Sequence, residues 1–174
     1  VVSGLRRRHP DAEIHLIVKS SFRATAELLP GVDRIFEIDG DALAKRVSAP
    51  DFLGAWNAVR RIADDLAATE YDALFNLTHS RAAAALVALM SARRRVGYGL
   101  DREGLRQVHE PWLTHMATLV RARRLSRFNL VDIYLGAAGL YGCGEGLAIE
   151  IPFQARRRAE ELLPGDAPRL AVQL

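Results

Sequence analysis

Short apolar segments alternate with amphipathic ones along the chain, and this pattern predicts strands and helices in turn. Ile14, Leu16 and Val18 occupy every second position, which is the period of a β-strand. The run at residues 71–77 is nearly free of charge after Asp72, as is typical of a strand buried on both faces of a parallel sheet. The predicted strands cover residues 12–19, 34–38, 71–77 and 95–98, with a further short strand at residues 107–109 and a last one at residues 169–174.

Helical periods separate these strands. Asp51 begins the clearest amphipathic helix, whose apolar side chains recur every three or four residues and are Phe52, Trp56, Val59, Ala63 and Leu66. Other helices are predicted over residues 20–29, 80–92, 112–123, 126–138 and 154–163, and the polar stretch at residues 40–50 is predicted to be a loop. Ser126 or Asn129 begins the helix that ends at Gly139, and one of its faces carries Phe128, Val131, Leu135 and Ala138. This alternation with short connections predicts an α/β fold with a doubly wound parallel sheet.

Composition narrows the class of protein. With 174 residues and a hydrophobic content of 49%, the chain is long enough for one domain with a buried core. Its net charge is only +3, but arginines cluster at residues 6–8, 93–95, 121–124 and 156–158, which suits recognition of phosphate and carboxylate groups. Solvated helix faces would explain the same clusters. No apolar run is long enough to span a membrane, and the single Cys143 cannot form an internal disulfide.

Several kinds of chemistry have no support in the sequence. The histidines lack the spacing of metal ligands and are His9, His15, His79, His109 and His115. There is no Walker loop and no Gly-x-Ser-x-Gly motif, and the glycine-rich residues 142–146 indicate a turn. Zinc-finger spacing and aromatic-basic ribonucleoprotein motifs are also absent, so we expect neither a metal nor a nucleic-acid partner.

The strongest candidate site follows the strand at residues 71–77. In an open parallel sheet, ligands bind beyond the carboxyl ends of the strands, and Thr78, His79, Ser80 and Arg81 lie at such an end. Two hydroxyls, the free backbone N–H groups and the helix dipole would together hold an anionic or polyhydroxylated ligand. His79 is also a candidate general base, although no carboxylate partner is visible. The structural alternative is a plain helix cap by Ser80 with His79 exposed to solvent.

Two other strand ends carry weaker candidates. Gly97 and Gly99 flank Tyr98 and would permit a sharp turn and close approach of a ligand to the backbone, although a tight connection alone would explain them. Asp101 and Arg102 follow directly, where they either pair with each other or face a substrate. The third candidate is the Lys-Ser-Ser segment at residues 19–21, after the first strand.

Several short motifs occur in an order that resembles one enzyme family. They are LRRRHPDAEI at residues 5–14, LPGVDRI at 29–35, YDALFNL at 71–77, RRVGY at 94–98 and RFNLVD at 127–132. Their order and spacing resemble the N-terminal half of glycosyltransferase family 9, the ADP-heptose:lipopolysaccharide heptosyltransferases. The similarity spans nearly the whole chain, and its weight comes from the order of the motifs.

The resemblance implies a Rossmann-like domain, the N-terminal half of a GT-B glycosyltransferase with its first strand missing. Residues 1–148 would be the acceptor-binding domain, and residues 149–174 the interdomain linker and the start of the nucleotide-sugar-binding domain. The family's opening strand and the Gly-Asp loop that carries the expected catalytic base would lie upstream of Val1. Without that central strand, its neighbours' backbone groups would be unpaired.

The resemblance also implies a function. The complete enzyme would be an inverting, metal-independent transferase that moves a heptose or related sugar to the lipopolysaccharide core. The donor, a nucleotide sugar such as ADP-heptose, would bind mainly the C-terminal domain, and the fragment itself would be inactive. Thr78, His79, Ser80, Arg81 and Arg102 would bind the anionic acceptor. We expect a cytoplasmic location with peripheral contact at the inner membrane. The alternatives are a non-catalytic anion-binding module and a fragment of a GT-B-like sugar-nucleotide epimerase.

Overall fold

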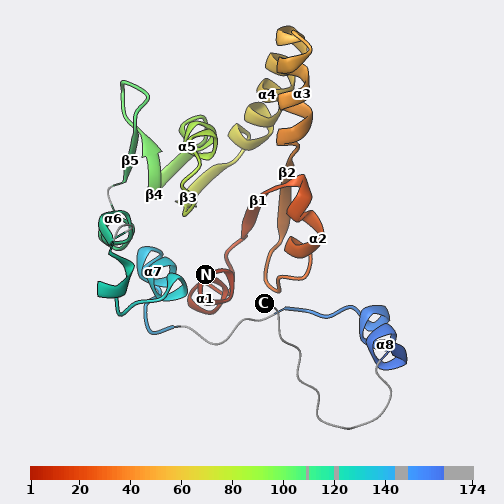
Figure 1. The fold of residues 1–174 in the computed structure, drawn as a ribbon, viewed down its shortest axis with the longest axis vertical. Helices are drawn as coiled ribbons and strands as arrows, with labels where there is room; N and C mark the ends of the chain where they lie inside the picture. Colours follow the sequence, from red (N-terminus) through yellow and green to blue (C-terminus); the bar gives the residue numbers. More distant parts are fainter. Residues whose placement is uncertain (109, 120–121, 144–148, 163–174) are drawn as a thin grey trace.

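The computed structural model describes residues 1–108, 110–119, 122–143 and 149–162, whose strands form two small sheets (Figure 1). Strand β1 (His15–Lys19) pairs in parallel with β2 (Arg34–Ile38). Strand β3 (Glu70–Asn76) pairs in parallel with β4 (Ser91–Leu100), and β5 (Arg106–Val108) runs antiparallel to β4. The α/β class is confirmed. The expected single parallel sheet is not formed by the described residues, because no backbone hydrogen bonds join β1 to β3.

Side chains hold the two sheets together in place of a backbone ladder. The imidazole Nδ1 of His15 on β1 lies 3.0 Å from the Tyr71 hydroxyl on β3. Ile17 and Phe36, from β1 and β2, pack against the buried residues Leu66 and Leu74 on the other side. The sheets therefore share an apolar core, and among the strands that the structure describes β1 and β3 each have a neighbour on one side only.

The first half of the chain contains the helical start that residues 2–10 indicate and one helix, at residues 40–48, that the sequence pattern did not predict. Helix α1 (Val2–Arg8) precedes β1, and a short helical turn (Ser20–Phe22) leads into α2 (Arg23–Ala26). Residues 40–50 were expected to be a loop, but Gly40–Ser48 form α3. The Asp39 carboxylate accepts a hydrogen bond from the Ala42 backbone N–H at 2.8 Å, which stabilises the start of this helix.

Helix α4 (Phe52–Ala67) begins at Asp51 as predicted, with the Asp51 carboxylate accepting from the Gly54 N–H at 2.9 Å. The periodicity indicated that its apolar residues face the core, but most of them do not. Only Leu66 among the five predicted apolar positions is buried, whereas Phe52 and Trp56 are each 65% exposed. The reason is that α3 and α4 pack as a hairpin that projects from the sheets, so the outer half of α4 has no sheet to cover (Figure 1).

The second half differs from the prediction mainly in boundaries. Helix α5 (Arg81–Ala88) is shorter than expected, because Ser91 and Ala92 belong to β4, where both pair with β3. Helix α6 (Pro111–Thr118) is followed by a short helical turn (Arg123–Leu125) and by α7 (Leu130–Ala137). Asn129 and Asp132 form a reciprocal capping box at the start of α7, and Gly139 has a positive φ of 73° beyond its end.

The packing of α7 confirms half of the predicted face. Leu135 and Ala138 are buried as expected, whereas Phe128 and Val131 are 39% and 53% exposed, and Ile133 and Ala137 are buried in addition. Ile133 and Ala137 pack with Tyr98 and Leu113, and a second buried group, Leu135, Ala138 and Leu140, receives Val1 and Leu5 of α1. Both faces of α7 are therefore covered, because it lies between α6 and α1.

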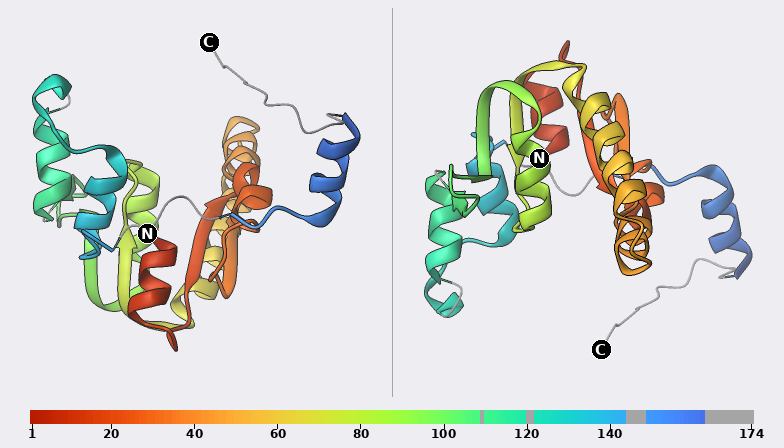
Figure 2. Two further views of the ribbon diagram at one scale, coloured as in Figure 1. Left: turned by 90° about the horizontal axis from the view of Figure 1, so that it is seen from below. Right: turned by 90° about the horizontal axis from the view of Figure 1, so that it is seen from above.

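Helix α8 (Phe153–Leu162) stands apart from both sheets, and none of its residues is buried (Figure 2). Glu150 donates its backbone N–H to the Leu28 carbonyl oxygen at 2.8 Å before the helix begins. The strand predicted at residues 169–174 lies outside the described residues, and the domain boundary at residue 149 stays a prediction.

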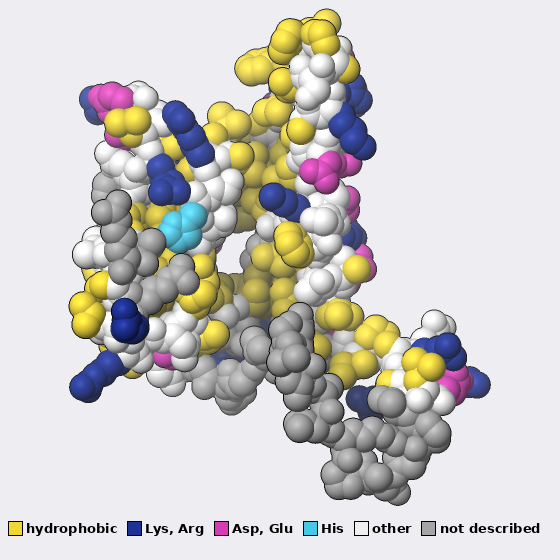
Figure 3. Space-filling model, in the orientation of Figure 1, with side chains coloured by type: hydrophobic (Ala, Val, Ile, Leu, Met, Phe, Trp, Pro, Cys, Tyr) yellow, Lys and Arg dark blue, Asp and Glu magenta, His cyan; other side chains and the backbone are white. Residues whose placement is uncertain are grey.

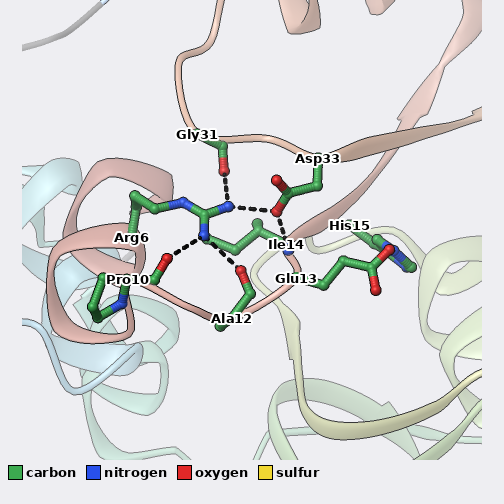
Figure 4. A network of polar contacts seen from close by, with 8 residues as sticks. All are labelled: Arg6, Pro10, Ala12, Glu13, Ile14, His15, Gly31 and Asp33. Atoms are coloured by element: carbon green, nitrogen blue, oxygen red, sulfur yellow. Dashed lines mark hydrogen bonds and ion pairs between the residues drawn. The ribbon is translucent and has the colours of Figure 1, made fainter.

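A polar network joins α1 to the turns on either side of β1 and β2 (Figure 4). The Arg6 guanidinium donates to the carbonyl oxygens of Pro10, Ala12 and Gly31 at 2.6–3.0 Å and pairs with the Asp33 carboxylate. Asp33 also accepts from the Ile14 N–H at 2.7 Å, and this bond, with the Arg6 contact, holds the pKa of Asp33 below its ordinary value. The LPGVDRI motif thus has a structural role in closing this turn.

Candidate functional site

The predicted loop after β3 is built on a buried asparagine. Asn76 is 4% exposed, and its amide Nδ2 donates to the Tyr98 carbonyl oxygen on β4 at 2.8 Å. Its Oδ1 accepts from the Thr78 N–H at 3.3 Å, and the Thr78 hydroxyl accepts in turn from the Ser80 N–H at 3.4 Å. Ser80 caps α5 by accepting from the Ala83 N–H at 3.3 Å. The loop is thus fixed to the sheet, and its residues 78–81 are exposed to solvent.

His79 packs on the neighbouring strand. Its Nε2 lies 3.1 Å from the Tyr98 hydroxyl, and the two ring centroids are 4.5 Å apart. Arg106 at the start of β5 donates to the His79 carbonyl oxygen, and its guanidinium lies 5.6 Å from the centre of the Tyr98 ring. Three side chains from β4, β5 and the β3–α5 loop therefore meet at one edge of the sheet.

Burial of the His79 imidazole against Tyr98 lowers the pKa of His79 below its ordinary 6.5, and the positive charge of Arg106 lowers it further. Burial raises the pKa of the Tyr98 hydroxyl above 10.0, an effect that the Arg106 charge partly offsets. At neutral pH the imidazole is therefore uncharged and the phenol is protonated. This pair can donate and accept hydrogen bonds, while the positive charge at this edge comes from arginine.

The loop between β4 and β5 lies beside the first loop. The Asp101 carboxylate accepts from the backbone N–H groups of Glu103 and Leu105 at 3.0 and 2.7 Å, and from the Gln107 side chain at 3.0 Å. Arg81 reaches across from α5 and donates to the Gly104 carbonyl oxygen at 3.2 Å. Two arginines, Arg81 and Arg106, thus link the two loops into one rim at the carboxyl ends of β3 and β4.

Gly97 and Gly99, on either side of Tyr98, differ in whether the structure requires glycine. Gly97 has a φ of 101°, and a Cβ there would lie 2.0 Å from the Asn76 carbonyl oxygen, so the close pairing of β3 and β4 requires glycine. No atoms lie within 4 Å of a Cβ built on Gly99. Its backbone therefore borders open space next to the rim.

The five predicted site residues all lie on this rim, Thr78, His79, Ser80 and Arg81 in one loop and Arg102 in the other. Ser80 is the helix cap that the structural alternative proposed, and His79 is exposed as that alternative expected, although one side of its ring contacts Tyr98. The Asp101–Arg102 pair is not formed, because Asp101 holds its own loop. Among the described residues Arg102 makes no hydrogen bond or ion pair and is exposed, so its guanidinium is open to a ligand.

Sequence reasoning missed Asn76 and Arg106 and treated Tyr98 only as a residue between two glycines. A buried asparagine in an otherwise apolar strand was a signal for Asn76, because such an amide needs partners across the strand. No comparable signal marked Arg106, whose contact with His79 joins residues 27 positions apart.

The third candidate strand end is separate from the rim. The Ser20 hydroxyl, directly after β1, is buried and has no hydrogen-bond partner among the described residues. Within the Lys-Ser-Ser segment, the Ser20 hydroxyl is thus shielded from solvent, whereas Lys19 is exposed.

The described ranges contain no group of three His, Cys, Asp or Glu side chains suited to a metal ion. Within them no helix is both long and apolar enough to cross a membrane. No protein-family model, no curated protein and no solved structure matches the chain.

Proposed function

We propose that the chain is the acceptor-binding part of a glycosyltransferase that moves a heptose or related sugar from a nucleotide sugar to the lipopolysaccharide core. The observation that carries this proposal is the single rim formed by the loops at residues 78–81 and 101–105, held together by Arg81 and Arg106. It offers hydroxyls, an uncharged imidazole and guanidinium groups on one edge of the sheet. Saccharides that carry phosphates and carboxylates need this combination of groups.

Each rim residue has a distinct part in this proposal. Arg102 makes the charge-assisted contact to a phosphate or carboxylate of the acceptor. Thr78 and Ser80 present hydroxyl oxygens that hydrogen-bond to sugar hydroxyls. Arg81 and Arg106 are already bound to backbone carbonyls, so they position the loops and add positive potential. His79 hydrogen-bonds as a neutral group.

Isothermal titration calorimetry with a phosphorylated lipopolysaccharide-core oligosaccharide tests the proposal. We expect the Arg102→Gln variant to bind about tenfold more weakly or worse, because one charged hydrogen bond to the ligand is lost. Arg93→Gln is the matched control, since Arg93 lies near the opposite end of β4 and pairs with Glu70 and Asp72. Equal affinities for the two variants would contradict the proposed rim.

A second candidate function, a module that binds an anionic partner without chemistry, is favoured by one observation. Asp101 is occupied by two backbone N–H groups and Gln107. Among the described residues no carboxylate contacts the His79 imidazole, whose ring nitrogen meets the Tyr98 hydroxyl instead, so His79 lacks the acidic partner that would orient it as a general base. Transfer of heptose from ADP-heptose by the protein in its complete reading frame would favour the transferase. Binding of the oligosaccharide without transfer would favour the module, and the epimerase alternative predicts conversion of the nucleotide sugar alone.

A further inference from the structure

The α3–α4 hairpin carries an apolar surface that no other described element covers. Figure 3 shows hydrophobic side chains gathered at its free end and along one side. Val47, Phe52, Leu53 and Trp56 lie around the turn between the helices and are 52–72% exposed. A groove between the helices continues this surface and is lined by Leu43, Val47, Phe52, Ala55, Trp56 and Val59. Large aromatic residues at the free end of a projecting hairpin are costly to leave in water.

Basic and acidic residues lie in different parts of the α3–α4 hairpin. Residues 42–61, which include the free end, carry four basic residues and one acidic residue. The basic residues are Lys45, Arg46, Arg60 and Arg61, and the acidic residue, Asp51, pairs with Arg46 at 2.9 Å. The end nearest the sheets carries Asp39, Asp41, Asp64 and Asp65 instead. The free end is therefore apolar, with Lys45 and the Arg46–Asp51 pair beside it, and the other four carboxylates lie towards the sheets, where Asp64 pairs with Arg60 at 3.7 Å.

From this arrangement we infer that the α3–α4 hairpin inserts its free end into the surface of a bilayer that contains anionic lipids. Phe52, Leu53 and Trp56 enter the headgroup region, where an aromatic ring with one polar edge is well accommodated. Lys45 and Arg61, which form no ion pair among the described residues, face the anionic headgroups. The acidic residues at the base remain in water.

A lipid surface fits these observations better than a folded protein partner. The apolar residues occupy the end of a projection, so they reach a flat surface without a matching pocket. Basic residues follow the apolar ones on both helices, Lys45 and Arg46 on α3 and Arg60 and Arg61 on α4, as in amphipathic elements that lie in a membrane interface. This inference stands on the hairpin alone and does not depend on the rim at β3 and β4.

Vesicle co-sedimentation tests the inference. We expect the chain to bind vesicles that contain phosphatidylglycerol and to bind phosphatidylcholine vesicles much more weakly. The Phe52→Ser/Trp56→Ser double variant should lose about tenfold or more in partitioning, because both side chains would leave the interface. Phe153→Ser on α8, where Phe153 is 76% exposed, is the matched control and should bind as the unchanged chain does.

A second pair of variants tests the charge. Lys45→Glu/Arg61→Glu should remove the preference for phosphatidylglycerol, and Arg157→Glu on α8 should preserve it. Thermal melting of every variant establishes that it folds. Three results would overturn the inference. These are no binding to phosphatidylglycerol vesicles, equal binding by the double variant and the control, or a dimer in sedimentation velocity that Phe52→Ser/Trp56→Ser dissolves without affecting vesicle binding. The last result would assign the surface to a second copy of the chain.

Discussion

At the scale of single residues, two ionisable side chains report directly on the geometry around them. Asp33 accepts from the Ile14 N–H and from Arg6, so its pKa lies below the ordinary 3.8. His79 packs on Tyr98 near Arg106, so its pKa lies below 6.5. Both shifts favour the form present at neutral pH, the carboxylate and the uncharged imidazole, and both therefore make folding more favourable at neutral than at acidic pH.

The Asp33 shift predicts a specific loss of stability in acid. Because the folded-state pKa is depressed, the contribution of Asp33 is present above pH 3.8 and is lost as the pH falls through the lower folded-state value. Asp33→Asn should lower the free energy of unfolding at pH 7. The difference in unfolding free energy between this variant and the unchanged protein should become smaller as the solution is acidified. Urea denaturation across this pH range measures both effects. Asp65→Asn on the exposed surface of α4 is the control, and a constant difference at all pH values would contradict the assignment.

The His79 shift predicts a titration midpoint below 6.5 in an NMR titration of the imidazole. Arg106→Gln should raise this midpoint, because a nearby positive charge is removed, but the midpoint should stay below 6.5 since burial is the larger cause. Between the lowered pKa and 6.5, stability should increase with pH, because the unfolded chain binds the proton more readily. Arg102→Gln should leave the midpoint where it is. A midpoint at or above 6.5 in the unchanged protein would show that His79 does not pack on Tyr98.

At the scale of elements, local signals predicted the ends of helices better than their packing. Asp51 before α4, and Asn129 and Gly139 around α7, act within a few residues, so the sequence alone identified them. The start of α3 depends on the single Asp39 cap in a polar stretch, which the hydrophobic pattern did not reveal. The buried face of α7 depends on α1 and α6, and the periodicity of α7 contains no information about those neighbours.

The close packing of α6 against α7 predicts the effect of a small substitution. A Cβ added at Gly136 would lie 2.4 Å from the Trp112 ring, which also stacks on Tyr141 with ring centroids 4.9 Å apart. Gly136→Ala should therefore lower the free energy of unfolding by about 1–3 kcal/mol, because the indole has to move. Gly40→Ala at the start of α3 is the control, since nothing lies within 4 Å of its Cβ. Equal unfolding free energies for the two variants would contradict this packing.

At the scale of the whole molecule, the sequence predicted the α/β class and the loops that form the rim, because strand ends follow from the order of elements. The resemblance implied unpaired strand edges, but the residue pattern did not show which strands would form which of the two sheets, since strand pairing is decided between distant segments. Nor did it predict the arginine contacts across the rim, because Arg81 with Gly104 and Arg106 with His79 join loops that the chain order leaves apart.

The two sheets predict a pattern of amide hydrogen exchange. In a parallel pair, alternate residues direct their N–H groups to the partner, so about half of the amides of β1 and β3 face away from β2 and β4. These amides should exchange much faster than their neighbours in sequence, as measured by NMR. Uniform protection of the amides along β1 and β3 would contradict the separation into two sheets. It would indicate that another strand forms hydrogen bonds with the free edges of β1 and β3.

The central claim is that an anionic saccharide binds the rim at the carboxyl ends of β3 and β4. The most direct measurement is a titration of the ¹⁵N-labelled protein with a phosphorylated lipopolysaccharide-core oligosaccharide, followed by amide chemical shifts. We expect saturable shifts at residues 78–81 and 101–106 that weaken strongly in Arg102→Gln and persist in Arg93→Gln. Shifts confined to the arginines of α8, or no saturable shifts on the rim, would contradict the claim.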